Sequence, residues 1–364
     1  MKLQLYTVRA MTDIDIPDTR ISRRSLLGGG LKLAGAAAIA SGAPGVLDAL
    51  ASSRAAASTL TNVPYQLGWV TNTEFAGTYL AQEHGYYAKG GISVAILPGG
   101  SVTVEPVVAS GKALVGDTNA DTVSAAVAAG APLRIIGARY QKNPFCIISS
   151  AAHPLKTPQS LVGKRIGVNQ YNLTAWNVFL ALNGIKASAV TTVNEGFTAG
   201  PSALADGQVD AWMGFITNEP GVLKLAGFDN YAFLMADFGY HVYADVYIAT
   251  VDAIKNHKKD LARFLKGELE GWMLDLAKPA VGTALTAKRY EKALGFSTRQ
   301  QSLENVAQAP LILTPYTKAH GLFAMDPVDV AKNLATLRFA SGHGTTKYYT
   351  GKDLFDSSIL DAIA

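Results

Sequence analysis

Side chains that could bind a small molecule gather just after the strand-like segments of this sequence. Trp69, Asn72 and Glu74 follow the first such segment, and Asp117 and Asn119 follow the third. In an open α/β sheet, ligands bind beyond the carboxyl ends of the strands, so these positions are expected to meet in space. Rings, amides and carboxylates together suit a planar ligand that stacks on an aromatic side chain and is held by hydrogen bonds.

The second half of the chain repeats this arrangement. Tyr171 and Asn172 follow one strand-like run, and Glu219 follows another. We therefore predict a ligand site formed by Trp69, Asn72, Glu74, Gly100, Ser101, Asp117, Asn119, Tyr140, Tyr171, Asn172, Glu219 and Tyr240. Two of these residues also have a purely structural explanation. Trp69 has the spacing to share a core face with Leu67, and residues 217–219 have the composition of a helix cap with an acidic first turn.

Motifs for catalysis and for metal binding are missing from the sequence. There is no Gly-x-Ser-x-Gly elbow, and the single cysteine, Cys146, lies in an apolar run that favours a buried side chain. The six histidines include no pair one helical turn apart. We expect a binding protein that uses no metal and no cofactor.

The elements that must position these residues alternate between strand and helix. Strands are predicted at 65–70, 92–97, 112–116 and 133–138, and helices at 74–83 and 122–129. A second group contains strands at 164–168, 190–194 and 208–215 and a helix at 174–182. A returning strand at 246–251 precedes long helices at 256–278 and 326–339, the last with Asp326 as its N-cap. This alternation predicts an α/β fold with largely parallel strands.

The boundaries between these groups divide the chain into four segments. We predict an export signal at 1–57, a first lobe that begins at 58–150, a second lobe at 151–245 and the rest of the first lobe at 246–364. The C-terminal helices are expected to pack on the first lobe and to carry no chemistry of their own. At 364 residues with 49% apolar and 16% charged side chains, the chain is long enough to bury a sizeable core.

The charge balance gives no reason to expect nucleic acid or a membrane surface as a partner. The chain has 32 Lys and Arg against 28 Asp and Glu, and seven of these basic and four of these acidic residues lie in positions 1–57. The remainder, 25 against 24, is almost neutral. Phosphate binding needs clustered Lys and Arg, and this sequence does not show such clusters.

The first segment has the order of features that marks an export signal. Arg23 and Arg24 precede a mild apolar run at 33–47, and small residues follow at 55–58. Paired arginines before a short, weakly apolar run favour the twin-arginine route. We expect the protein in the periplasm or outside the cell.

Several segments resemble the solute-binding proteins of ABC importers. These are LGWVTNTEFAG at 67–77, GYYAKGGISV at 85–94, LVGKRIGV at 161–168, and LADGQVDAW at 204–212 followed by TNEP at 217–220. The resemblance covers about the whole chain after the signal. It is strongest to the branch that binds thiamine-related pyrimidines, riboflavin, alkanesulfonates, taurine or nitrate.

This resemblance implies the type II periplasmic binding fold, in which two α/β lobes joined by a two-strand hinge close on a ligand between them. The implied partners are a small-molecule solute and an ABC permease in the cytoplasmic membrane, and the protein is expected to be a monomer. Within the branch, Trp69, Asn72 and Glu219 are more similar to the pyrimidine and flavin binders. A carboxylate such as Glu219 would repel an anion.

Two other functions on the same fold are the alternatives. One is a receptor for alkanesulfonates, taurine or nitrate. The other is an enzyme, the fungal-type pyrimidine synthase of thiamine biosynthesis. The enzyme has the pattern Asn-Thr-Asn-His-Thr-Gly after the tryptophan, whereas this chain has Asn72, Thr73, Glu74, Phe75, Ala76 and Gly77. The histidine is replaced by Phe75, and the cysteine cluster of the enzyme is missing.

Overall fold

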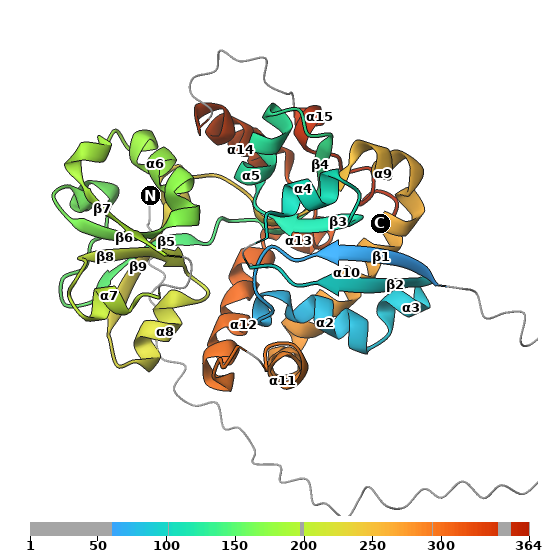
Figure 1. Cartoon of the computed structure of the whole chain (residues 1–364), viewed down its shortest axis with the longest axis horizontal. Coiled ribbons are helices and arrows are strands. Elements are labelled where there is room, and N and C mark those ends of the chain that lie inside the picture. Colours follow the sequence, from blue (N-terminus) through green and yellow to red (C-terminus); the bar gives the residue numbers. More distant parts are fainter. Residues whose placement is uncertain (1–59, 101, 197–199, 293, 341–350, 364) are drawn as a thin grey trace, which may run out of the picture. The chain divides into compact units, whose positions relative to one another are not determined.

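Two mixed sheets of five strands each organise the protein in a computed structural model (Figure 1). The structure describes residues 60–340 and 351–363, apart from 101, 197–199 and 293. The expected export signal at 1–57 lies outside the described residues. Residues 58–364 form one compact unit that contains both sheets.

The first sheet has the strand order β2-β1-β3-β10-β4. Both β2 and β3 run parallel to β1, whereas β10 runs antiparallel to β3 and to β4. Apolar residues on both faces bury these strands, as expected for a sheet covered by helices. The bounds are β1 Thr61–Gln66, β2 Ile92–Leu97, β3 Val115–Thr118, β4 Leu133–Tyr140 and β10 Ala244–Thr250.

The second sheet has the order β7-β6-β8-β5-β9. Here β6 is parallel to β7 and β8, and β5 is antiparallel to β8 and β9. We call each sheet with its covering helices a lobe. The bounds are β5 Phe145–Ser150, β6 Arg165–Asn169, β7 Thr191–Glu195, β8 Ala211–Phe215 and β9 Asn230–Leu234.

The chain passes between the two sheets twice, once between β4 and β5 and once between β9 and β10. The prediction placed the first boundary after residue 150, but β5 already belongs to the second sheet. Its apolar run Phe145–Ser150 shows only that the strand is buried, and its pairing with β8 and β9 is a long-range contact. The second passage falls at 239–243, close to the predicted boundary at 245.

Helices cover the sheets and connect their strands. The amphipathic helix α10 packs along α2 on the first lobe, where Gly271 approaches the Gly77 carbonyl so closely that a Cβ would lie 2.1 Å from its oxygen. The helices before β6 are α2 Ala76–Glu83, α3 Tyr86–Lys89, α4 Val104–Ala109 and α5 Ala120–Ala128, with the 3-10 turns η1 Thr73–Phe75 and η2 Pro158–Leu161.

The second lobe contains η3 Gln170–Asn172, α6 Leu173–Leu182, η4 Ala187–Ala189, α7 Ser202–Ala205, α8 Glu219–Leu225 and η5 Met235–Phe238. The C-terminal helices are α9 Val251–Asn256, α10 Lys258–Ala277, α11 Pro279–Arg289, α12 Thr298–Ile312, α13 Pro315–His320, α14 Pro327–Ala340 and α15 Gly351–Leu354. The side chain of Asp326 accepts a hydrogen bond from the Val328 backbone, so it caps α14 as predicted. Among the described residues, no helix is long and apolar enough to cross a membrane.

The structure contains β5, β9, α11 and α12, for which the sequence predicted no element, and it shifts the bounds of β1 and β3. Strand β1 ends at Gln66 because the chain turns at Gly68, where a Cβ would lie 2.6 Å from the Asp117 carbonyl oxygen. Trp69 therefore lies in the loop after β1. Strand β3 begins at Val115, after a turn at Gly111 with φ of 75°, so Asp117 is part of the strand.

Candidate functional site

A pocket of about 170 Å³ opens between the two sheets, at the ends of their strands. Both lobes contribute to it, as expected for a fold that binds its ligand where strands end. Its walls are formed by Gly68, Trp69, Asn72, Glu74, Asp117, Thr118, Asn119, Asn169, Tyr171, Asn172, Trp212, Met213, Gly214, Phe215, Thr217, Asn218, Glu219, Asp245 and Glu304.

The loop between β1 and α2 forms the first-lobe wall. Trp69 lines the pocket and also packs against the core, so both of its sequence-based interpretations apply. The Asn72 side chain caps η1 by accepting a hydrogen bond from the Glu74 backbone at 3.1 Å. That cap fixes the direction in which Glu74 leaves the backbone.

Helix α12 holds this loop in place from behind. The Gln301 side chain accepts a hydrogen bond from the Thr73 backbone at 2.8 Å, and Gln308 donates to the Thr73 carbonyl at 2.8 Å. Asn72 donates to the Glu304 carboxylate at 2.7 Å, and Gln301 donates to the other Glu304 oxygen at 2.9 Å. The expectation that the C-terminal helices carry no chemistry was wrong, because α12 places Glu304 in the pocket wall.

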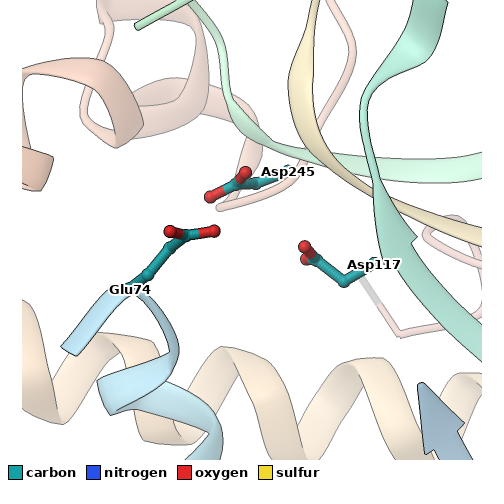
Figure 2. Close-up of side chains that lie close together, drawn as sticks. All are labelled: Glu74, Asp117 and Asp245. Carbon is teal, nitrogen blue, oxygen red and sulfur yellow. The ribbon is translucent and has the colours of Figure 1, made fainter. Parts of the chain in front are cut away.

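Three buried carboxylates converge beside this loop. Oxygens of Glu74, Asp117 and Asp245 all lie within 4.8 Å of one another, and Figure 2 shows them turned toward a common space. Asp245 has a backbone φ of 49°, in the left-handed region that aspartate tolerates better than most residues. Such strain is retained where the surrounding structure determines it, often at a functional site.

Arg139 lies behind the carboxylates as their counter-charge. Its Nη2 is 2.5 Å from Asp245 Oδ2 and 3.4 Å from Asp117 Oδ2, and the side chain is fully buried. The guanidinium lies over the rings of Phe75, Tyr140 and Trp272, with 4.8 Å to the nearest ring centre. Aromatic faces stabilise a cation, which compensates in part for the lost hydration.

Burial raises the pKa values of all three carboxylates in this cluster. Desolvation raises the pKa of Glu74 well above its ordinary value, and the negative charge of Asp245 raises it further. Desolvation also raises the pKa of Asp117 and of Asp245, although Arg139 opposes both shifts. Burial disfavours the charge on Arg139, but the attraction of Asp117 and Asp245 outweighs it and keeps the pKa of Arg139 above its ordinary value.

Two further carboxylates line the pocket away from this cluster. Burial, with a contribution from the charge of Glu219, raises the pKa of Glu304 to about 8. Burial raises the pKa of Glu219 to about 7, against the hydrogen bond from the Phe215 backbone. The pocket therefore holds five carboxyl groups that bind protons more tightly than usual. No lysine, arginine or histidine is among the described residues that line it.

The second-lobe wall is formed by η3, by the end of β8 and by the start of α8. Asn169 caps η3 by accepting a hydrogen bond from the Tyr171 backbone at 3.1 Å. Glu219, the first residue of α8, accepts a hydrogen bond from the Phe215 backbone at 2.7 Å. A Cβ at Gly214 would lie 2.7 Å from the Glu219 carboxyl, so the glycine makes room for it.

Most of the predicted site residues line the pocket. These are Trp69, Asn72, Glu74, Asp117, Asn119, Tyr171, Asn172 and Glu219. Ser101 lies outside the described residues. Gly100 is not part of the wall; its φ of 112° suits the turn that follows β2.

Two predicted tyrosines lie elsewhere. Tyr140 ends β4 in the core, where its hydroxyl donates to Gln308 at 2.7 Å. Tyr240 donates to Asp121 at 2.9 Å and borders a second, mostly apolar cavity of about 110 Å³. Both were chosen for their ring type near strand ends, a pattern that does not reveal on which face a ring lies.

Asp245 and Glu304 are the acidic wall residues that sequence reasoning missed. Asp245 is the second residue of β10, which runs antiparallel to its neighbours, so the N-terminal end of β10 meets the carboxyl end of β3. A prediction that considers only residues after the carboxyl end of each strand misses a residue at the N-terminal end of an antiparallel strand. Glu304 lies inside a helix with a weak apolar pattern, and its acidic type alone gives no signal.

Comparison with known families assigns the chain. Residues 72–281, more than half of the chain, match the family described as NMT1/THI5 like. The chain belongs to the NMT1/THI5-like family. The sequence resemblance to this group of solute-binding proteins is thereby confirmed.

Relatives of this NMT1/THI5-like protein have names of two kinds. It is 27% identical over 291 residues to the 4-amino-5-hydroxymethyl-2-methylpyrimidine phosphate synthase of Uromyces fabae. The alignment covers 71% of this chain and 83% of the relative. It is 28% identical over 229 residues to the riboflavin-binding protein RibY of Chloroflexus aurantiacus, with 61% and 64% covered. It is 26% identical over 234 residues to the formylaminopyrimidine-binding protein of Halalkalibacterium halodurans, with 62% and 71% covered.

Solved structures show the fold of this NMT1/THI5-like protein. The alkanesulfonate-binding protein SsuA from Xanthomonas axonopodis, solved with bound MOPS, superposes with a TM-score of 0.58 at 17% identity, over 82% of this chain and 99% of that chain. SsuA from Escherichia coli gives a TM-score of 0.56 at 18% identity, over 77% and 85%. The predicted fold class, two α/β lobes of the periplasmic binding type, is confirmed.

Proposed function

We propose that this protein is the extracytoplasmic solute-binding component of an ABC importer. Its solute is a small nitrogen heterocycle, with a thiamine-related pyrimidine or a flavin as the first choice. The observation that carries this proposal is the pocket wall. An aromatic ring at Trp69 and the amides of Asn72, Asn119 and Asn172 accompany five carboxyl groups, so the wall offers a stacking surface and many acceptors for ligand N–H groups.

An anionic solute fits this wall poorly. Sulfonates and nitrate need cations or unobstructed helix N-termini, whereas the N-terminus of α8 carries Glu219. Arg139 is already engaged by Asp117 and Asp245. Bringing a sulfonate beside Glu74, Glu219 and Glu304 would repel its charge, which favours a ligand rich in donors.

A synthase role is the alternative from another class, and three relatives carry such a name. Phe75 stands where the pattern of that enzyme has histidine, and its ring supports Arg139 rather than offering an acid or base. Burial raises the pKa of the Cys146 thiol well above its ordinary value, which disfavours the reactive thiolate. Two relatives that are named as riboflavin-binding and formylaminopyrimidine-binding proteins support the binding role.

The experiment that tests the solute class is a thermal-shift panel on the chain that begins at residue 58. It compares aminopyrimidines, riboflavin, taurine, an alkanesulfonate and nitrate. A ligand at 100 times its dissociation constant adds about 2.7 kcal/mol to the free energy of unfolding, a readily measured shift. Stabilisation by sulfonates, taurine or nitrate alone would overturn the heterocycle while leaving a binding protein.

Export through the twin-arginine system, and delivery to a permease, complete the proposal. Arg23 and Arg24 before a weakly apolar run support the route. The precursor with both arginines changed to lysine is expected to stay in the cytoplasm, measured by fractionation. Normal export of that variant would point to the general secretory route instead.

A further inference from the structure

The pocket has more acidic groups than its own cation can balance. Five carboxyl groups line it, and the nearby guanidinium of Arg139 pairs with only two of them, Asp117 and Asp245. A surplus of buried carboxylates is costly unless protons or a bound cation compensate for it. Burial raises the pKa values of Glu74, Glu304 and Glu219, which favours protons as this compensation in the unliganded protein.

Glu74 is the carboxylate in the cluster that lacks a partner of its own. Its side chain is only 8% exposed, and among the described residues no donor forms a hydrogen bond with its oxygens. By contrast, Asp245 accepts from Arg139, and Asp117 lies 3.4 Å from both Arg139 and the Tyr65 hydroxyl. Figure 2 shows the Glu74 carboxylate directed into the space that it shares with the two aspartates.

The backbone around Glu74 holds it in this position despite the cost. Asn72 caps the turn that contains it, and Gln301 of α12 anchors the residue before it. A flexible loop would let an unpartnered carboxylate turn to water. The rigid support keeps acceptor capacity in the wall of a ligand pocket, which is where an unsatisfied group is useful.

We propose that Glu74, together with Asp245, forms a subsite for a positively charged nitrogen of the ligand, an ammonium or an amidinium. This inference rests on the proposed binding function and narrows it to cationic heterocycles. The ligand cation would contact Glu74 and Asp245 from the pocket and would replace the protons that the cluster holds. A neutral heterocycle of the same shape would leave Glu74 without a partner and would bind more weakly.

The test compares two probes that differ in one group. 4-Amino-5-aminomethyl-2-methylpyrimidine carries an ammonium at neutral pH, and 4-amino-5-hydroxymethyl-2-methylpyrimidine has a hydroxyl in its place. Calorimetry on the wild-type protein is expected to show the ammonium probe binding at least tenfold more tightly. In Glu74→Gln this preference is expected to disappear. Asp275→Asn, which neutralises a buried carboxyl outside the pocket wall, should keep the preference.

The unliganded protein gives a second measurement. At a pH high enough to ionise Glu74, removing this unpartnered buried charge should raise the melting temperature of Glu74→Gln above that of the wild-type protein, whereas loss of a structural hydrogen-bond acceptor would lower it. A lower melting temperature, or equal affinity of the two probes for the wild-type protein, would overturn the cation subsite.

Further arms separate this inference from the function on which it rests. Benzamidine presents an amidinium without a pyrimidine. If benzamidine binds in a Glu74-dependent manner while neither pyrimidine binds, the heterocycle proposal fails and the cation subsite stands. If Mg²⁺ or Zn²⁺ stabilises the wild-type protein but not Glu74→Gln, the cluster is a metal site and the inference is wrong.

Discussion

The Glu219 carboxylate combines a structural contact with a place in the pocket wall. One oxygen accepts the Phe215 backbone N–H at 2.7 Å, at the end of β8. The same side chain faces the space that a ligand would fill. The two sequence-based interpretations, ligand contact and helix start, therefore describe one residue, and they are separated only by variants that remove one role at a time.

Glu219→Gln is expected to keep the structural contact and weaken binding. The amide oxygen of glutamine still accepts from Phe215, so the free energy of unfolding should change little. Loss of the negative charge removes a charge-assisted hydrogen bond worth about 1.5 to 3 kcal/mol, which is about tenfold or more in affinity. Calorimetry and denaturant unfolding measure the two quantities on the same protein.

Glu219→Ala provides the comparison. It also leaves the Phe215 N–H without its acceptor, and it should lose about 1 to 3 kcal/mol of stability in addition to affinity. Unchanged affinity in both variants would remove Glu219 from the ligand site and leave it a structural role only.

At the scale of elements, α12 is the part of the first lobe that makes the site rigid. Its buried face carries Gln301, Glu304 and Gln308, and all three form hydrogen bonds with the loop that carries Asn72 and Glu74. This polar face explains why the helix shows almost no amphipathic pattern. The buried side chains of α12 form hydrogen bonds with a backbone turn instead of filling an apolar core.

Gln301→Ala is expected to loosen that turn. The Thr73 N–H, buried and bonded to Gln301 at 2.8 Å, would lose its acceptor, at a cost of about 1 to 3 kcal/mol in the free energy of unfolding. Ligand affinity should fall as well, because Glu74 is no longer held in place. Arg299→Ala, an exposed change on the same helix, is the matched control, measured by denaturant unfolding and calorimetry. Identical behaviour of the two variants would contradict the anchoring role.

For the whole molecule, the raised carboxyl pKa values predict an unusual dependence of stability on pH. Burial raises the pKa of Glu219 and of Asp275 to about 7 and that of Glu304 to about 8. Between about pH 4.5 and these values, the folded protein keeps protons that the unfolded chain has lost. The free energy of unfolding therefore falls as the pH rises, by about 1.4 kcal/mol per pH unit for each such group.

Other titrating groups change this trend little. Burial lowers the pKa of His241, so its contribution to the free energy of unfolding grows as the pH rises toward about 6.5 and stays constant above that value, but it is one group against several. Hydrogen bonds from arginine are the main cause of the lowered pKa values of Glu83 and Asp210. Their contribution to the free energy of unfolding therefore changes only below about pH 4.5. Denaturant unfolding at pH 5, 6.5 and 8 and constant ionic strength measures the trend. Stability that is flat or rises over this range would contradict it.

We propose that the two lobes close on the ligand when it binds. Such a motion would change the contacts between the lobes. On the pocket side, Gln300 of α12 donates to Asn218 at 3.4 Å. Tyr240, in the passage from β9 to β10, donates to Asp121 of α5. A hinge motion would have to alter contacts of this kind, because the first joins the two lobes and the second joins the passage between them to the first lobe.

The sequence by itself determined the local parts of this protein. Alternation of strand and helix predicted the fold class, the bounds of β2 agree with the prediction, and the Asp326 cap lies at the start of α14. Polar residues after parallel strands also located Trp69, Asn72 and Glu219 in the pocket wall. These features depend on periodicity and on caps, which act over a few neighbouring residues and are visible in the sequence.

Only the tertiary structure decided which residues complete the site. Asp245 reaches it through an antiparallel pairing with β3, and Glu304 through the packing of α12 against a loop more than 200 residues earlier. Tyr140 and Tyr240 turn toward other partners for the same kind of reason. Strand pairing and helix packing are long-range contacts between surfaces that a local pattern does not describe, so the carboxylate cluster around Arg139 appears only when the chain is folded.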